Sequence, residues 1–163
     1  MTQPSGQQAA PDPELDPADA ARMLWEIEQI KQLKARYFRF VDTRDWDGVV
    51  ALFSADCDLH STLFPEARQP RDFFAKVALM ITPGISVHHG HMPEITLTSW
   101  ETATGIWAMY DCVQTDDGSV GYRGYGHYHE SYRKDHGRGW LISGFELRRL
   151  RVDWFAGGPG SAR

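Results

Sequence analysis

Apolar residues recur at three- and four-residue steps between about residues 17 and 43, the spacing of a helix with one apolar face. The stripe consists of Trp25, Ile27, Ile30, Leu33, Tyr37, Phe40 and Val41. Asp16 and Pro17 supply an N-cap and a proline at the first helical position. The pattern therefore predicts a long first helix, and similar spacing predicts a short helix over 46–53 and a third over 70–81.

The remaining apolar positions alternate with polar ones, which is typical of strands. The predicted strands cover residues 57–64, 85–98, 103–115, 119–134 and 140–153. Asp117-Gly118 and His136-Gly137 are turn signals between the last three. Helices that precede long antiparallel strands indicate an α+β fold. We expect a curved, mostly antiparallel sheet wrapped over the long helix, with an apolar interior suited to small hydrophobic ligands.

Composition sets the limits of the domain and of its partners. Residues 1–15 are polar and proline-rich, so we expect a disordered tail, then a single domain over 16–155 and a flexible tail over 156–163. The net charge of −5 disfavours nucleic-acid and anionic-membrane partners. There is no signal-peptide pattern and no apolar run near the roughly 20 residues of a membrane span, so we expect a cytoplasmic protein. Cys57 and Cys112 predict two reduced thiols.

Three stretches carry a resemblance to a known family. They are "IEQIKQLKARYFRFVDTRDWDGVVALFSADCDL", "VHHGHMPEITL" and "RGYGHYHESYRKDHGRGWLIS". Together they resemble the SnoaL-like branch of the NTF2-like superfamily over about residues 24–154. The resemblance implies a cone-shaped α+β barrel, a homo-oligomer (trimer or dimer) and cofactor-independent chemistry inside a dry pocket.

Members of that superfamily include scytalone dehydratase, ketosteroid isomerase, polyketide cyclases, limonene epoxide hydrolase, the bile-acid 7α-dehydratase and the lindane dehydrochlorinase. The β subunits of ring-hydroxylating dioxygenases share the fold and are structural. The fold alone therefore does not define the reaction.

Asp42 and Tyr37 lie at the end of the helical stripe. Spacing alone also allows Asp42 to be a carboxylate that accepts a hydrogen bond from a backbone N–H near the helix end. It likewise allows Tyr37 to be an aromatic residue of the core. The resemblance places Asp42 where relatives orient or activate a histidine. It makes Tyr37 a neutral hydrogen-bond donor to a substrate carbonyl or enolate.

Three histidines lie close together at His88, His89 and His91. Strand alternation puts His89 and His91 on one face and His88 on the other. The first two could therefore supply two metal ligands, with a third from His127 or His129, although nothing in the sequence fixes that third ligand.

The resemblance instead selects His88 as a catalytic base paired with Asp42. A buried carboxylate holds the imidazole tautomer and stabilises the imidazolium that forms. Gly90 and Pro93 could bulge the strand and reverse the facing of its residues. His91 is then the alternative base.

Two further groups are candidates for substrate binding. Tyr125, His127 and His129 share one strand face, which is either a pocket wall or a solvated outer face or interface. Arg149 and Arg151 share a face of the last strand, where relatives carry a pocket arginine.

We therefore predict a dehydratase or isomerase without a cofactor, acting on a small, largely apolar cyclic or polycyclic substrate. Its catalytic residues would be His88 or His91, Asp42 and Tyr37. Residues binding the substrate would be His89, Tyr125, His127, His129 and Arg149. The alternatives are a polyketide cyclase, a metal-dependent site, a non-catalytic binding or structural subunit, and an epoxide hydrolase, which gains support if Asp111 faces inward.

Overall fold

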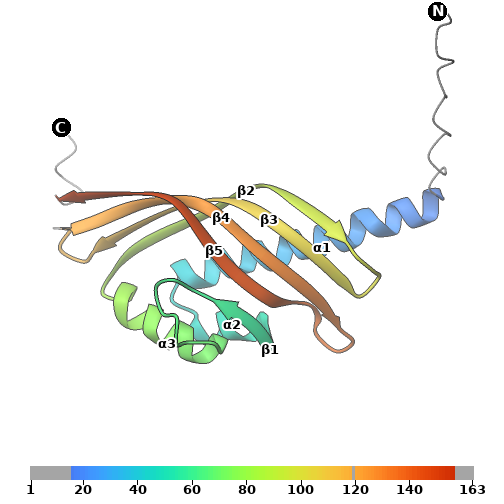
Figure 1. Ribbon diagram of the computed structural model, residues 1–163, viewed down its shortest axis with the longest axis horizontal. Coiled ribbons are helices and arrows are strands. Elements are labelled where there is room, and N and C mark those ends of the chain that lie inside the picture. The colour runs from blue at the N-terminus through green and yellow to red at the C-terminus, as the bar shows by residue number, and fades with distance from the viewer. Residues whose placement is uncertain (1–15, 119, 157–163) are drawn as a thin grey trace, which may run out of the picture.

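The computed structural model describes residues 16–118 and 120–156 (Figure 1). Its elements are α1 (Pro17–Asp42), α2 (Trp46–Ala51), β1 (Phe53–His60), α3 (Pro70–Ile81), β2 (Gly84–Leu97), β3 (Thr102–Thr115), β4 (Val120–Asp135) and β5 (Gly139–Ala156). The predicted tails lie outside the described residues, apart from Ala156, which belongs to β5.

Helix α1 forms as its sequence predicts. The Asp16 side chain accepts a hydrogen bond from the backbone N–H of Ala18 at 2.8 Å, and Pro17 follows at the first helical position. The buried face repeats at helical spacing through Ile30, Leu33, Tyr37 and Val41. Burial of each large apolar side chain contributes about 1.5–3 kcal/mol. Trp25 departs from the predicted stripe, because it is 64% exposed while its neighbour Glu26 is buried.

The five strands form one sheet in the order β1-β5-β4-β3-β2. β1 runs parallel to β5, and the other neighbouring strands are antiparallel. In Figure 1 the long strands curve across α1, and α2 and α3 lie beneath them beside β1. The predicted α+β class and NTF2-like architecture are confirmed. The sheet is curved but does not close, so β1 and β2 are its edges.

The first strand lies about four residues earlier than predicted. It spans Phe53–His60, and α2 ends at Ala51. The pairing with β5 shifts register between Phe53 and Asp58, so both Phe53 and Ser54 are buried and the simple alternation is lost. The side chain of Ser61 then accepts a hydrogen bond from the backbone of Leu63 at 3.1 Å, just after the strand ends.

The facing of β2 depends on where that strand bulges. The register with β3 shifts between His91 and Glu94, where Met92 has a φ of 37°. The bulge follows the histidines, so alternation is unbroken through the first half of β2. A side chain at Gly90 would place its Cβ 2.6 Å from the Phe38 ring, so this glycine permits the close packing of α1 on β2.

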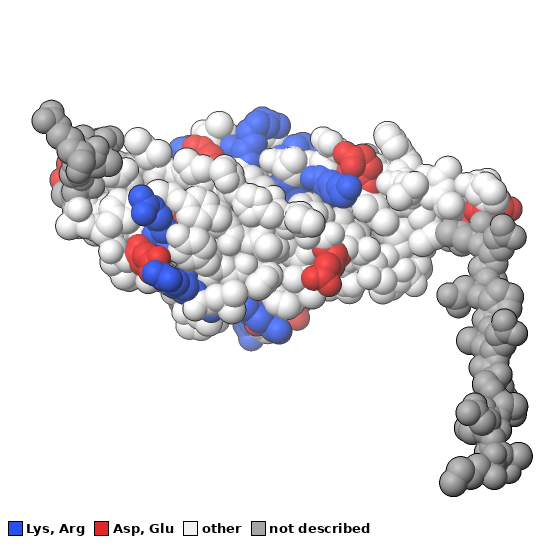
Figure 2. All heavy atoms as spheres, turned by 90° about the horizontal axis from the view of Figure 1, so that it is seen from above, with Lys and Arg blue, Asp and Glu red and all other residues white. Residues whose placement is uncertain are grey.

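The surface away from α3 carries few charges near its middle. Figure 2 shows this side as mostly uncharged, with basic and acidic groups interspersed toward its two long margins. No helix within residues 16–118 and 120–156 is long and apolar enough to cross a membrane. Cys57 and Cys112 are free thiols, and burial raises the pKa of Cys57 to about 12.

Candidate active site

A cavity of about 320 Å³ lies between the inner face of the sheet, α1 and α3. Its walls are mostly apolar and include Phe73, Phe74, Val77, Phe145, Leu147 and Trp154. The polar side chains among its lining residues are Tyr37, Ser61, Thr62, His88, Asp111, Tyr122, Tyr128 and Arg149. An apolar chamber with a small set of polar groups is the usual form of a small-molecule site.

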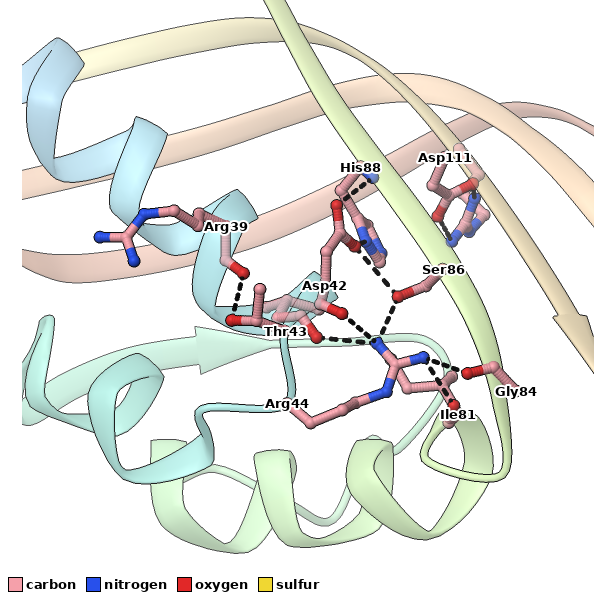
Figure 3. A network of polar contacts seen from close by, with 11 residues as sticks. Arg39, Asp42, Thr43, Arg44, Ile81, Gly84, Ser86, His88 and Asp111 are labelled. Atoms are coloured by element: carbon pink, nitrogen blue, oxygen red, sulfur yellow. Dashed lines mark hydrogen bonds and ion pairs between the residues drawn. The ribbon is translucent and has the colours of Figure 1, made fainter. Parts of the chain in front are cut away.

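His88 and Asp42 meet at the wall of this cavity (Figure 3). The Nδ1 atom of His88 lies 2.6 Å from Oδ1 of Asp42, and the backbone N–H of His88 donates to Oδ2 at 2.9 Å. The two side chains are 11% and 24% exposed. Because a carboxylate only accepts, Nδ1 carries the proton that lies between them. The Nε2 atom of a neutral His88 is therefore the ring nitrogen with a free lone pair.

Asp42 is itself held by Ser86 and Arg44. The Ser86 hydroxyl donates to Oδ1 of Asp42 at 3.0 Å and accepts from Arg44 at 2.6 Å. Burial raises the pKa of Asp42, but the hydrogen bonds from His88 and Ser86 outweigh it and leave that pKa below its ordinary value. Asp42 is therefore ionised at neutral pH, as an imidazolium partner must be.

Arg44 connects the end of α1 to the start of β2. Its guanidinium also donates to the backbone oxygens of Val41, Asp42, Ile81 and Gly84 at 2.7 to 3.2 Å. Its own backbone is left-handed, with a φ of 64°. A non-glycine residue adopts this conformation only when its surroundings hold it there. One side chain thus fixes both elements that carry Asp42 and His88.

A second charged pair lines the cavity beside the first. Asp111 lies opposite His88 in the β2–β3 register. It accepts two hydrogen bonds from Arg149, at 3.0 and 2.6 Å, and its side chain is 2% exposed. The pair occupies the space above Gly124, whose Cβ would lie 1.9 Å from Arg149 Nη1 and 2.1 Å from Asp111 Oδ1. The absence of a side chain at position 124 therefore leaves the space that the Asp111–Arg149 pair occupies.

Two phenols complete the polar lining. Tyr37 and Tyr128 are buried with ring centroids 6.0 Å apart. Burial raises the pKa of both phenols well above the ordinary value. Both are therefore neutral hydrogen-bond donors at physiological pH.

The model of a SnoaL-like domain matches residues 22–146 of this chain. The chain belongs to the SnoaL-like family.

Several solved structures share the fold of this SnoaL-like protein. A candidate scytalone dehydratase from Novosphingobium aromaticivorans is 19% identical with a TM-score of 0.75, covering 88% of this chain and 99% of that one. A type 2 hexachlorocyclohexane dehydrochlorinase, LinA, is 16% identical with a TM-score of 0.74, covering 86% and 99%. The type 3 dehydrochlorinase from Novosphingobium barchaimii is 16% identical with a TM-score of 0.73, covering 85% and 95%. At these identities the likeness establishes the fold.

Five predicted residues of the SnoaL-like protein lie away from this cavity. His89, His91, Tyr125, His127 and His129 are on the outer face of the sheet and do not line the cavity. Because the bulge follows His91, that histidine does not turn inward, and β4 presents its other residues to the interior. We therefore do not propose a catalytic role for His91. Nor do we propose substrate contacts in this cavity for the other four residues.

The last strand also differs from its predicted facing. The β4–β5 register shifts between Tyr125 and Gly126, so that Gly126 pairs with Arg149 while Tyr125 pairs with Arg151. This irregularity separates the two arginines that were expected to share a face. Arg149 lines the cavity, whereas Arg151 is exposed and pairs with Asp153 at 2.6 Å.

Metal ligation by the histidine cluster has no geometric support. Within residues 16–118 and 120–156, no three His, Cys, Asp or Glu side chains are grouped as a metal site would require. His89 and His91 lie side by side with ring centroids 5.8 Å apart, and Tyr110 on β3 lies opposite His89.

The homo-oligomer expected for a SnoaL-like protein stays a prediction.

Sequence reasoning missed several residues of the site. Tyr128, Ser86 and Arg44 were not among the predicted residues. The relevant signal was present for Tyr128, because it shares strand parity with Glu130 and Tyr132, all of which are buried. For Arg44 no local signal exists, since its partners come from α1, the end of α3 and β2.

Proposed function

We propose that this SnoaL-like protein removes a proton from carbon next to a carbonyl in a small, uncharged cyclic substrate, leading to loss of water or to isomerisation. The contact between His88 and Asp42 at the cavity wall carries the proposal. It supplies a histidine of fixed tautomer whose second nitrogen is available as a base. General acid–base catalysis of this kind contributes about 10²–10⁴-fold to a rate.

The proposed reaction begins with transfer of the substrate's C–H proton to Nε2 of His88. The Asp42 carboxylate stabilises the imidazolium that results. The electron pair of the broken C–H bond moves toward the carbonyl oxygen, which accepts a hydrogen bond from a phenol in the cavity wall. In a dehydration, the imidazolium or a phenol then gives a proton to the departing hydroxyl. Ring closure by a polyketide cyclase begins with the same carbanion.

The charges of the cavity support an uncharged substrate. Arg149 is held by both oxygens of Asp111, and the negative charge of Asp42 is offset by Arg44. Among the described residues that line the cavity, these pairings leave no unbalanced cation to recognise a carboxylate or a phosphate. The mostly apolar walls and a volume of about 320 Å³ are consistent with a small cyclic molecule.

The reaction can be tested before the natural substrate is known. A panel of cyclic ketones and β-hydroxy ketones is incubated with the protein in D₂O, and exchange at the carbon next to the carbonyl is followed by NMR. We expect exchange with at least one member of the panel, and a loss of about 10²-fold or more in His88→Ala. His89→Ala is the matched control, because it removes the adjacent histidine on the other face of β2.

Two results would contradict the proposal. Equal exchange by the wild type and His88→Ala would exclude this histidine as the base. Ketone binding without exchange by the wild type would favour the ligand-binding alternative. Thermal shift measurements on the same panel distinguish binding from the absence of binding.

Epoxide hydrolysis is the second candidate, and the inward position of Asp111 favours it. A buried carboxylate held by an arginine resembles part of the Asp-Arg-Asp set that this chemistry requires. In that reaction a carboxylate takes a proton from water, the water oxygen attacks an epoxide carbon, and the opened oxygen receives a proton. Diol formation from cyclic epoxides, abolished in Asp111→Asn but retained in His88→Ala, would select hydrolysis over the first proposal.

A further inference from the structure

A buried ion pair lies directly behind the phenols of the cavity. Lys34 on α1 donates to Glu130 on β4, and both side chains are fully buried. The second oxygen of Glu130 accepts a hydrogen bond from the Tyr132 hydroxyl at 2.5 Å. Placing two charges in the interior carries a desolvation penalty of several kcal/mol per ion, and an apolar pair often gives a more stable protein. The position of this pair therefore suggests a role beyond stability.

The positive end of the pair faces the two phenol rings. The Lys34 ammonium lies 3.5 Å from the ring centroid of Tyr128 and 4.1 Å from that of Tyr37. A cation over an aromatic face is attracted to the electrons of the ring. That attraction strengthens when the ring gains negative charge, which happens when its hydroxyl donates a hydrogen bond or loses a proton. Lys34 therefore favours donation by the phenol closest to it.

Of the two phenols, Tyr128 is better placed to donate to a ligand. The Lys34 ammonium lies nearer the Tyr128 ring than the Tyr37 ring, at 3.5 Å against 4.1 Å from the centroids. Tyr128 also lines the cavity together with His88.

We propose that Tyr128, polarised through its ring by the buried Lys34 ammonium, donates the hydrogen bond that stabilises the substrate oxygen. Lys34 is a positioning residue in this arrangement, and Glu130 keeps its ammonium in place. When His88 takes the substrate proton, the electron pair reaches the carbonyl oxygen and the O–H of Tyr128 is directed at it. The assignment of a substrate contact rests on the proposed function, whereas the link between Lys34 and the phenol is independent of any substrate.

The electrostatic interaction between Lys34 and the Tyr128 phenol can be measured on the full chain with trifluorotyrosine, a more acidic phenol, placed at position 128. Its ¹⁹F resonances report the acid dissociation constant of this one phenol among the six tyrosines of the chain. The comparison is between the otherwise native protein and Lys34→Met/Glu130→Gln, which removes both charges together. Lys31→Met is the matched control, since Lys31 lies on the same helix with a side chain that is 46% exposed.

Loss of the Lys34 charge lowers the acid dissociation constant of the phenol, whereas loss of the Glu130 charge raises it. Because the ammonium lies against the ring, we expect a net fall of about tenfold in the double variant and no change in Lys31→Met. Lys34→Arg, which retains a positive charge, is expected to stay closer to the native value than the double variant. A value in the double variant within twofold of the native one would overturn the proposal and leave the ion pair with a structural role only.

A second measurement covers a double variant that does not fold. It uses Glu130→Gln, which leaves the Lys34 ammonium without the carboxylate that holds it. In the ketone exchange assay we expect this variant to lose about tenfold in rate, and we expect no further loss when Glu130→Gln is added to Tyr128→Phe. Equal losses in the two backgrounds would overturn the proposal.

The substrate contact has its own test. In the ketone exchange assay, Tyr128→Phe is expected to lower the rate at least tenfold and by more than Tyr37→Phe. A larger loss in Tyr37→Phe would reassign the donor to Tyr37. If His88→Ala leaves exchange intact while the ¹⁹F shift is present, the proposed reaction fails and the electrostatic link stands.

Discussion

Asp42 contacts His88 through both of its carboxylate oxygens, one to the ring at 2.6 Å and one to the backbone at 2.9 Å. The contact joins the last residue of α1 to β2, across 46 positions of the sequence. It fixes the position of the imidazole and its tautomer at the same time. The consequences for substitution of Asp42 follow directly.

Asp42→Asn is expected to retain the fold and lose the fixed tautomer. The amide keeps one acceptor oxygen but presents an N–H₂ group where a second acceptor is needed. Ketone exchange should fall by about 10²–10⁴-fold, and ¹⁵N spectra of the ring should show that the Nδ1–H form no longer predominates. Asp58→Asn is the control, since Asp58 pairs with His60 in an exposed position. Unchanged ring spectra in Asp42→Asn would contradict the role of this carboxylate.

Arg44→Met is expected to loosen the junction of α1 and β2. The variant leaves the carbonyl groups of Ile81 and Gly84 and the Ser86 hydroxyl without their donor. Loss of such partners costs about 1–3 kcal/mol for a group left buried and unsatisfied, so we expect destabilisation by roughly 2–4 kcal/mol. Urea unfolding measures it, with Arg36→Met, an exposed arginine of α1, as control. Equal stability of the two variants would show that Arg44 is dispensable.

Gly124→Ala is expected to separate Asp111 from Arg149. The added methyl group overlaps both partners, whereas a Cβ at Gly137 would meet its nearest atom at 3.5 Å. Overpacking of a well-packed site costs about 1–3 kcal/mol, and the displaced arginine should also change ligand affinity. Thermal unfolding and ketone binding by both variants test this. A Gly124→Ala protein as stable as Gly137→Ala would contradict the close packing of the pair.

Alkaline unfolding should be coupled to ionisation of the buried phenols. Burial raises the pKa of Tyr37, Tyr128 and Tyr132 well above the ordinary value, and that of Tyr122 to about 12. Above pH 10 the unfolded chain therefore loses these protons before the folded chain does, so stability falls as pH rises. Each such tyrosine removes about 1.4 kcal/mol per pH unit, until its folded pKa is reached.

Absorbance at 295 nm and far-UV circular dichroism, followed together from pH 9 to 13, check this expectation. Ionisation of the buried phenols should coincide with loss of secondary structure. Full ionisation of all six tyrosines in a folded protein would contradict their burial.

Periodicity predicts most of this fold because most of its elements are regular. Helix α1 and most of each long strand follow regular patterns, and the order of these elements determines the α+β class. The errors occur where a strand is irregular. The register shift after Phe53 displaced β1, and the shift opposite Tyr125 separated Arg149 from Arg151.

The site was predictable only in part, for a similar reason. Strand parity separated His88 from His89 and His91, and the family resemblance selected His88 and Asp42, which the structure brings into contact. The other charged pairs depend on contacts between distant segments. Lys34 and Glu130 are 96 positions apart, and no local pattern marks a lysine whose side chain is fully buried.

The balanced charges of the cavity bear on how a ligand enters it. Electrostatic steering accelerates association when a cleft presents an excess of one sign, and added salt removes that gain. With Asp111 matched by Arg149 and Asp42 offset by Arg44, the cavity exerts little net attraction on a distant molecule. Capture of a ligand should therefore proceed at a rate that ionic strength barely changes, set by diffusion and by passage between apolar walls.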